Sequence, residues 1–142
     1  MMFELFNRKK LILKPLSERV SDLNISHMLE IDGRIPEFKH RALPLLADRI
    51  SGALQSGASI IMFMGGHVIR SGVSKFLIEL MKKKIITHFA LNGSCIIHDF
   101  ELALTGKTTE SVAKYISEGQ FGLWNETGKI NEAVKTGAKE NI

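Results

Sequence analysis

The stretch ASIIMFMGGHVIRSG, residues 58–72, decides the fold that we expect for this chain. Residues 58–64 form a short apolar run with β-branched members, which is long enough for a buried strand. The glycine-containing residues 65–72 interrupt that run and predict a loop. An amphipathic helix should follow, because apolar residues recur at i, i+3, i+4, i+7 and i+8. These are Val73, Phe76, Leu77, Leu80 and Met81.

The same order of elements recurs further along the chain. Residues 85–91 form a second apolar run, which ends at residues 92–94, and a helix is expected from about Ile96 to Leu104, with Gly106 as its stop. Strands that lack period-2 alternation and are separated by a helix are typical of a parallel sheet with both faces covered. Ligands of such sheets lie at the carboxyl ends of the strands. The segments to search are therefore Gly65–Gly72 and Asn92–Asp99.

Before this region the patterns are weaker. A helix should begin near Pro44 and end at Gly57, and residues 11–14 suggest a short edge strand. Only two strands are convincing, whereas a sheet usually has about four to six. Either partner subunits supply the missing strands, or the chain is the N-terminal part of a larger fold. We favour the second explanation, and expect an α/β fold that is incomplete at its C-terminus, with residues 1–142 as one domain.

The C-terminal third is expected to be helical. Thr108 or Thr109 should cap a short helix that ends at Gly119. Residues 120–128, which hold the one tryptophan, read as an irregular loop, and a last helix should begin near Ile130.

The composition limits the classes of protein. No apolar run reaches the roughly 18 residues of a membrane span, so no membrane association is expected. A single cysteine, Cys95, fits a reducing cytosol and predicts a cytoplasmic protein. The net charge of +4 is mild, and the basic clusters at residues 8–10 and 82–84 have no interleaved aromatic residues. Solvated lysines at helix ends explain them better than a nucleic-acid surface.

Two segments resemble a known family. The run Val68–Val73, followed by an amphipathic helix, a lysine-rich end and an apolar strand, is similar to deoxyhypusine synthase. The run Asn92–Phe100 resembles that family's Gly-Gly segment, and the resemblance covers roughly residues 44–106. It implies a Rossmann-like three-layer fold with a parallel sheet, NAD as cofactor, and a homo-oligomer, either a dimer or a tetramer. It also implies NAD-dependent transfer of the aminobutyl group of spermidine to a protein lysine or another polyamine.

Cofactor-binding residues are expected in both segments. Ser71 and Gly72 match the family's Ser-Gly near the cofactor, and Asp99 matches the acid that closes the second motif. Independently, glycines allow close backbone approach, a helix N-terminus offers N–H groups, and Arg70 carries a fork suited to phosphate. The alternative is a tight turn beside a surface arginine. The complete expected set is Gly65, Gly66, His67, Arg70, Ser71, Gly72, Asn92, Gly93, Ser94, His98 and Asp99.

The sequence also departs from the family. Gly66 and His67 stand where the family commonly has Ser-Asn, Arg70 replaces a serine, and Ile97 and His98 replace a Glu-Glu pair. The family's catalytic lysine lies in a C-terminal half that these 142 residues do not include. No catalytic residue is assigned, and whether the chain is an enzyme is left open. The alternative function is a non-catalytic nucleotide-binding or structural assembly protein.

A third interpretation uses the cysteine and histidines. Cys95 with His98 could form a nucleophile and base, and His67, His98 and Asp99 could meet as metal ligands of a hydrolase. A lone cysteine is more often inert packing, and no H-x-x-H or H-x-H spacing is present. No metal is therefore expected.

Overall fold

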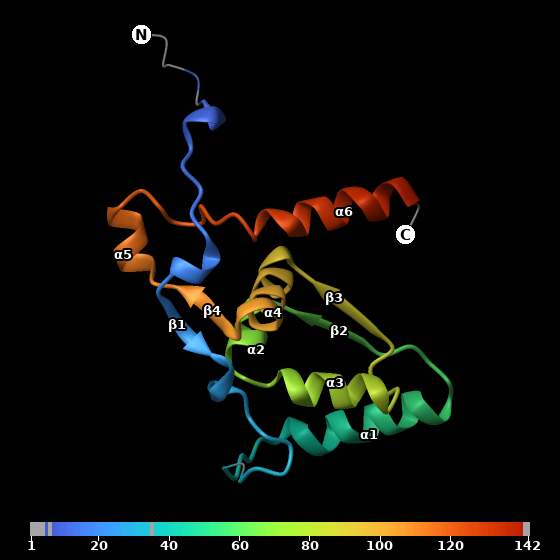
Figure 1. Ribbon diagram of the computed structural model, residues 1–142. Coiled ribbons are helices and arrows are strands. Elements are labelled where there is room, and N and C mark those ends of the chain that lie inside the picture. The colour runs from blue at the N-terminus through green and yellow to red at the C-terminus, as the bar shows by residue number, and fades with distance from the viewer. Residues whose placement is uncertain (1–4, 6, 35, 141–142) are drawn as a thin grey trace. The chain divides into compact units, whose positions relative to one another are not determined.

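The computed structural model describes residue 5, residues 7–34 and residues 36–140 (Figure 1). The chain divides into two compact units. We call Ile25–Asp99 the central unit, and Met1–Asn24 with Phe100–Ile142 the terminal unit. Of the described residues, 51% lie in helices and 13% in strands, so the mixed α/β class expected from the sequence is confirmed.

The central unit contains the parallel pairing that the apolar runs predict. Strands β2 and β3 are hydrogen-bonded side by side and parallel, with Ile61 opposite His88 and Met64 opposite Leu91 (Figure 1). Both strands are shorter than the apolar runs and occupy their C-terminal parts. The elements are, in chain order, the 3-10 turn η3 (Ile25–His27), α1 (Ala42–Gln55), β2 (Ile61–Met64), α2 (Gly66–Arg70), α3 (Ser74–Lys82), β3 (His88–Leu91) and the start of α4 (Gly93–Thr105).

The segment Gly65–Gly72 is not the loop that we predicted. It contains the short helix α2, which ends where Gly72 adopts a positive φ of 85°. Gly65 is extended and separates the strand from the helix. The two adjacent glycines suggested a loop, but only Gly65 lies outside regular structure, and Gly66 is the first residue of α2. The predicted helices on either side are confirmed, as α1 and α3.

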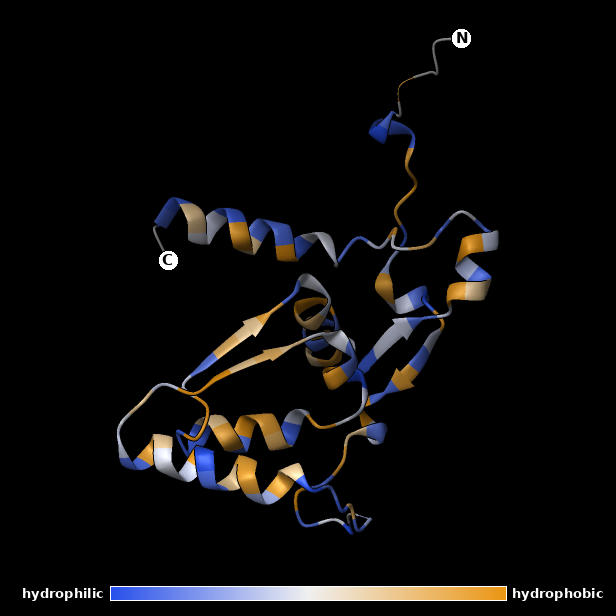
Figure 2. Cartoon of the chain, turned by 180° about the vertical axis from the view of Figure 1, so that it is seen from behind, coloured by the Kyte–Doolittle hydropathy of each residue, from blue (hydrophilic) through white to orange (hydrophobic). Residues whose placement is uncertain are grey.

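The faces of the parallel pair differ from expectation. We expected both to be buried, but Ile61 and Phe63 are 54% and 79% exposed. Figure 2 shows β2 and β3 coloured as apolar over most of their length. Within the described residues the parallel sheet has only two strands, which leave alternate side chains of β2 uncovered. None of the α1 residues is buried either.

The terminal unit is built on an antiparallel pair that the sequence did not indicate. Strands β1 and β4 pair with Ser21 opposite Glu110. Their short polar sequences, SDLN and KTTE, lack an apolar pattern. The described elements of this unit are the 3-10 turns η1 (Arg8–Lys10) and η2 (Leu16–Glu18), β1 (Ser21–Asn24), the end of α4, β4 (Lys107–Glu110), α5 (Val112–Ser117) and α6 (Gly128–Glu140).

Two predictions for this unit are wrong. Thr108 and Thr109 lie in β4 instead of capping a helix, and the Thr108 hydroxyl donates to Glu101 at 2.8 Å. The following helix, α5, begins after Ser111, so neither threonine stands at its cap position. Residues 11–14 form no strand, and only Lys14 pairs, in a single bridge with Trp124.

A small aromatic core fixes the predicted loop at residues 120–128. Tyr115 and Trp124 pack edge to face with ring centroids 5.0 Å apart, and Leu16 completes the buried cluster. Trp124 Nε1 donates to Glu110 at 2.8 Å, and the Leu16 N–H donates to Glu126 at 2.7 Å. The carboxylates of Glu110 and Glu126 therefore hold Trp124 and Leu16 in this core.

We expect the second of these carboxylates to make stability depend on acid pH. The Leu16 N–H bond to Glu126 lowers the pKa of that carboxyl below its ordinary value. A lowered folded-state pKa means stabilisation that is present at neutral pH and is lost as the pH falls through the ordinary and then the lowered value. Melting temperatures of Glu126→Gln, followed by Trp124 fluorescence from pH 7 to pH 3, should therefore decline less steeply than those of the unmodified protein. Glu118→Gln, at an exposed position on the same unit, is the control and should leave the slope unchanged.

Candidate functional site

The segments that follow β2 and β3 meet at the carboxyl edge of the parallel pair. The Gly66 N–H donates to Ser94 Oγ at 3.2 Å, and the Cys95 thiol donates to the Met64 carbonyl at 3.5 Å. The expected convergence of these two segments is therefore seen. It follows from parallel pairing, which brings both carboxyl ends to one edge.

Asn92 has a fixed side chain at this edge. Its Oδ1 accepts the Ser94 hydroxyl at 2.7 Å and the Cys95 N–H at 3.3 Å, which caps the first turn of α4. The Cys95 N–H can only donate, so this bond identifies the oxygen and orients the amide. Its Nδ2 has no hydrogen-bond partner within the described part of the chain. Asn92 thus presents a free donor of defined direction.

Gly66 serves packing within this edge. It is buried, and a Cβ there would lie 2.7 Å from Ser94 Oγ and 2.8 Å from His98 Cδ2. Its N–H is engaged by Ser94, so it is not one of the free N–H groups that the sequence interpretation assumed. The Ser94 and His98 side chains of α4 leave no free space for a Cβ at position 66, so a larger residue requires them to shift.

We expect Gly66→Ala to lower the free energy of unfolding of the central unit by about 1–3 kcal/mol, as an overpacked site does. Ser94 and His98 must shift to admit the methyl group, and the bond between the two segments weakens. Gly93→Ala is the matched control, since a Cβ at Gly93 meets nothing within 4 Å. Hydrogen exchange of residues 61–70 should speed up in the first variant only. Equal protection in both variants would contradict this packing role.

The residues at the C-terminal end of α2 are used differently from one another. Arg70 Nε is buried and lacks a hydrogen-bond partner in the part of the chain that the structure describes. The Ser71 hydroxyl donates to the Val68 carbonyl at 2.7 Å, within α2. Gly72 makes the turn into α3, and its carbonyl accepts the Leu29 N–H at 2.8 Å. Arg70 is therefore the residue of this group with unused polar capacity.

The histidine and cysteine interpretations gain no support. His67 and Asp99 are exposed, whereas His98 lies half-buried against Gly66. In the described ranges no three His, Cys, Asp or Glu side chains are placed to hold a metal ion. Cys95 is 1% exposed and its thiol is directed at a backbone carbonyl, so it is inert packing rather than a nucleophile.

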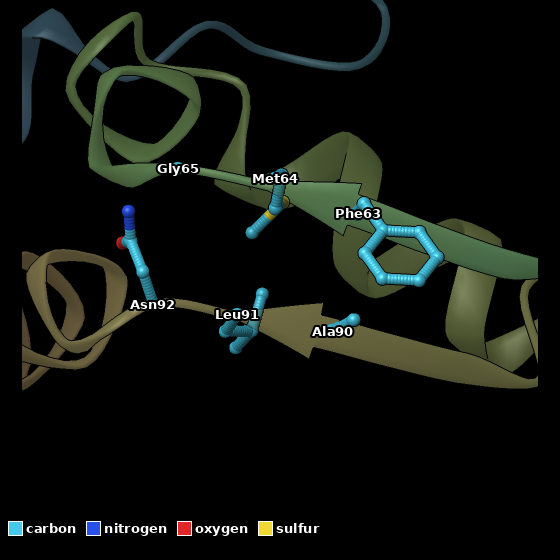
Figure 3. A pocket seen from close by; sticks show the side chains of 6 residues that line it. All are labelled: Phe63, Met64, Gly65, Ala90, Leu91 and Asn92. Carbon is cyan, nitrogen blue, oxygen red and sulfur yellow. The ribbon is translucent and has the colours of Figure 1, made fainter.

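An open hollow of about 540 Å³ lies at the same edge (Figure 3). Phe63 lies opposite Ala90 in the register and Met64 opposite Leu91, and these two pairs form the apolar part. Figure 3 shows the Asn92 side chain rising from the end of β3 toward Gly65, with its nitrogen leading. Gly65 and Asn92 complete the lining.

Sequence reasoning missed the strand residues of this hollow. Residues 58–64 and 85–91 were treated as buried strand, so their side chains were not considered as lining. The available signal was the position of a large Phe63 and a small Ala90 just before two polar turns.

The chain matches no known family, no curated protein and no solved structure. Along the described ranges no helix has both the length and the apolar character to cross a membrane.

Proposed function

We propose that the carboxyl edge of β2 and β3 binds a nucleotide cofactor. The observation that carries this proposal is the meeting of the two polar segments through the Gly66–Ser94 bond, directly beside the hollow. Nucleotides bind at the carboxyl ends of parallel strands, and small-molecule sites commonly measure about 300–1,000 Å³. The hollow of about 540 Å³ lies within that range.

We assign to Arg70, at the end of α2 and outside the lining of the hollow, an anionic part of the ligand that extends beyond the hollow. Its Nε is buried and unsatisfied among the described residues, and a buried polar group without a partner is unfavourable. A phosphate or carboxylate would supply the missing acceptor. Ser71, Gly72 and Asp99 enter the proposal through the family resemblance alone.

The resemblance to deoxyhypusine synthase extends the proposal to NAD and to aminobutyl transfer from spermidine to a protein lysine or polyamine. The protein would then be a cytoplasmic Rossmann-like transferase that works as a dimer or tetramer. In this proposal the described residues bind and orient the cofactor, and a lysine for the covalent step is not assigned.

Calorimetric titration with NAD tests the proposal. We expect a dissociation constant below about 1 mM, in the range in which enzymes use their ligands. Arg70→Gln should weaken binding about tenfold or more, since a hydrogen bond to a charged group contributes about 1.5–3 kcal/mol. Arg49→Gln, at an exposed arginine of the same unit, should leave binding unchanged. Absence of both heat and a thermal shift at millimolar NAD would contradict the proposal.

A second candidate is a non-catalytic assembly protein. The observation that favours it is the exposed apolar surface of α1, where four leucines are 42–53% exposed. These are Leu43, Leu45, Leu46 and Leu54. Concentration-dependent association that Leu46→Glu abolishes, in a protein without NAD response, would support this candidate. NAD-dependent cleavage of spermidine by the purified protein would rule it out.

A further inference from the structure

We infer that the hollow takes the flat ring of a heteroaromatic base that carries a hydrogen-bond acceptor, and that Asn92 recognises this acceptor. The inference rests on the proposed nucleotide function and assigns one part of the ligand to one part of the edge. Adenine and nicotinamide both have the required chemistry, with a ring face and an acceptor nitrogen or carbonyl oxygen.

The apolar part of the hollow suits a ring. Phe63 is 79% exposed, which is unusual for a large side chain on a strand, and it lies opposite Ala90 in the register. The short Ala90 side chain leaves free space beside the phenyl group. Aromatic side chains bind bases through their faces without regard to sequence or substituents. A planar ring beside Phe63 and over Ala90 would cover apolar surface that the described residues leave open.

The polar part of the hollow determines how a ligand is oriented. The Asn92 oxygen accepts from Ser94 and Cys95, and turning the amide over would lose the bond from the Cys95 N–H, which can only donate. Its Nδ2 therefore remains a donor at the end of the hollow (Figure 3). A fixed donor next to an apolar wall selects a ring with an acceptor on its edge over a purely apolar ring.

Two variants separate these contributions. Asn92→Asp keeps an oxygen for the Ser94 hydroxyl and the Cys95 N–H, but replaces the donor with a second acceptor. This variant should keep the cap on the first turn of α4 but no longer bind the ring. Phe63→Ala removes the aromatic wall at a position where the side chain is 79% exposed, so little packing is lost. Ile61→Ala is the matched control, because Ile61 is exposed on the same face of β2 and does not line the hollow.

Fragments of the nucleotide separate the hollow from the phosphate contacts. Adenosine and nicotinamide riboside carry a ring without phosphate, and ribose 5-phosphate carries phosphate without a ring. We expect one or both nucleosides to shift the backbone amide signals of residues 63 and 90–92. Asn92→Asp and Phe63→Ala should each lower the affinity for that nucleoside about tenfold, which equals about 1.4 kcal/mol. Ile61→Ala should change the affinity for the nucleoside by less than twofold. The affinity for ribose 5-phosphate should be the same in all three variants.

The outcomes distinguish the two proposals. If NAD and ribose 5-phosphate bind but Asn92→Asp and Phe63→Ala leave nucleoside binding unchanged, the ring site is overturned and nucleotide binding stands. If the nucleosides bind in the hollow and phosphate adds no affinity, the ring site stands and the proposed cofactor function falls. If no nucleoside binds, the ring site is overturned.

Discussion

Arg19→Met should lower the free energy of unfolding of the terminal unit by about 3–5 kcal/mol, because removal of one partner leaves the other charge buried and unpaired. The Arg19 guanidinium binds Glu101 in a two-bond fork, with distances of 2.6 and 2.8 Å. The two side chains are only 2% and 3% exposed. Methionine retains an apolar chain of similar length, so the lost charge dominates the effect. Urea unfolding followed by Trp124 fluorescence reports on this unit, since the guanidinium lies 5.8 Å from the indole centroid.

A double variant tests the explanation. Arg19→Met with Glu101→Gln removes the unpaired charge and keeps an oxygen that can accept the Thr108 hydroxyl. It should recover more than half of the stability lost in the single variant. Lys82→Met is the control for an exposed pair, because Lys82 and Glu79 are 68% and 31% exposed, and it should cost less than about 1 kcal/mol. Since Lys82 lies in the central unit, the stability of this variant is followed by hydrogen exchange of α3 instead of Trp124 fluorescence. A loss in Arg19→Met no larger than in Lys82→Met would show that the buried pair is not the source.

The sequence predicted the parallel pair well and the antiparallel pair not at all. Apolar runs before two turns were enough to locate β2 and β3, and the helix period located α3. Strands β1 and β4 have no such signal, because their residues owe their conformation to partners far along the chain. Leu23 of β1 pairs with Thr108 of β4, and neither residue has a local pattern that indicates the other.

The meeting of the two segments was predicted, and their use as a cofactor site stays a prediction. Both segments at the carboxyl edge were identified from their turn residues, and the structure brings Gly66 to Ser94. The use of each residue was not predictable, since a glycine that faces a ligand and one that faces a helix look alike in sequence. Only the distance from Gly66 to Ser94 and His98 shows that packing requires this glycine.

Gly72→Ala should be the most damaging single change in the central unit. At a φ of 85°, a Cβ would lie 2.5 Å from the His27 carbonyl oxygen. A backbone atom cannot move aside as a flexible side chain can, and the bond from the Leu29 N–H to the Gly72 carbonyl depends on the same geometry. We expect overpacking to cost about 1–3 kcal/mol and the left-handed backbone a further 1–2 kcal/mol or so.

Gly57→Ala separates these two costs. Gly57 also has a positive φ, of 69°, but a Cβ there meets nothing within 4 Å. Gly57→Ala should therefore lose only the stability that the left-handed backbone costs, and none to overpacking. Hydrogen exchange measured over residues 25–34 and 66–82 should be faster in Gly72→Ala than in Gly57→Ala, because the clash separates the turn at Gly72 from residues 27–29. Equal exchange in the two variants would mean that the turn tolerates the methyl group. In that case the approach of His27 would not be what requires a glycine at position 72.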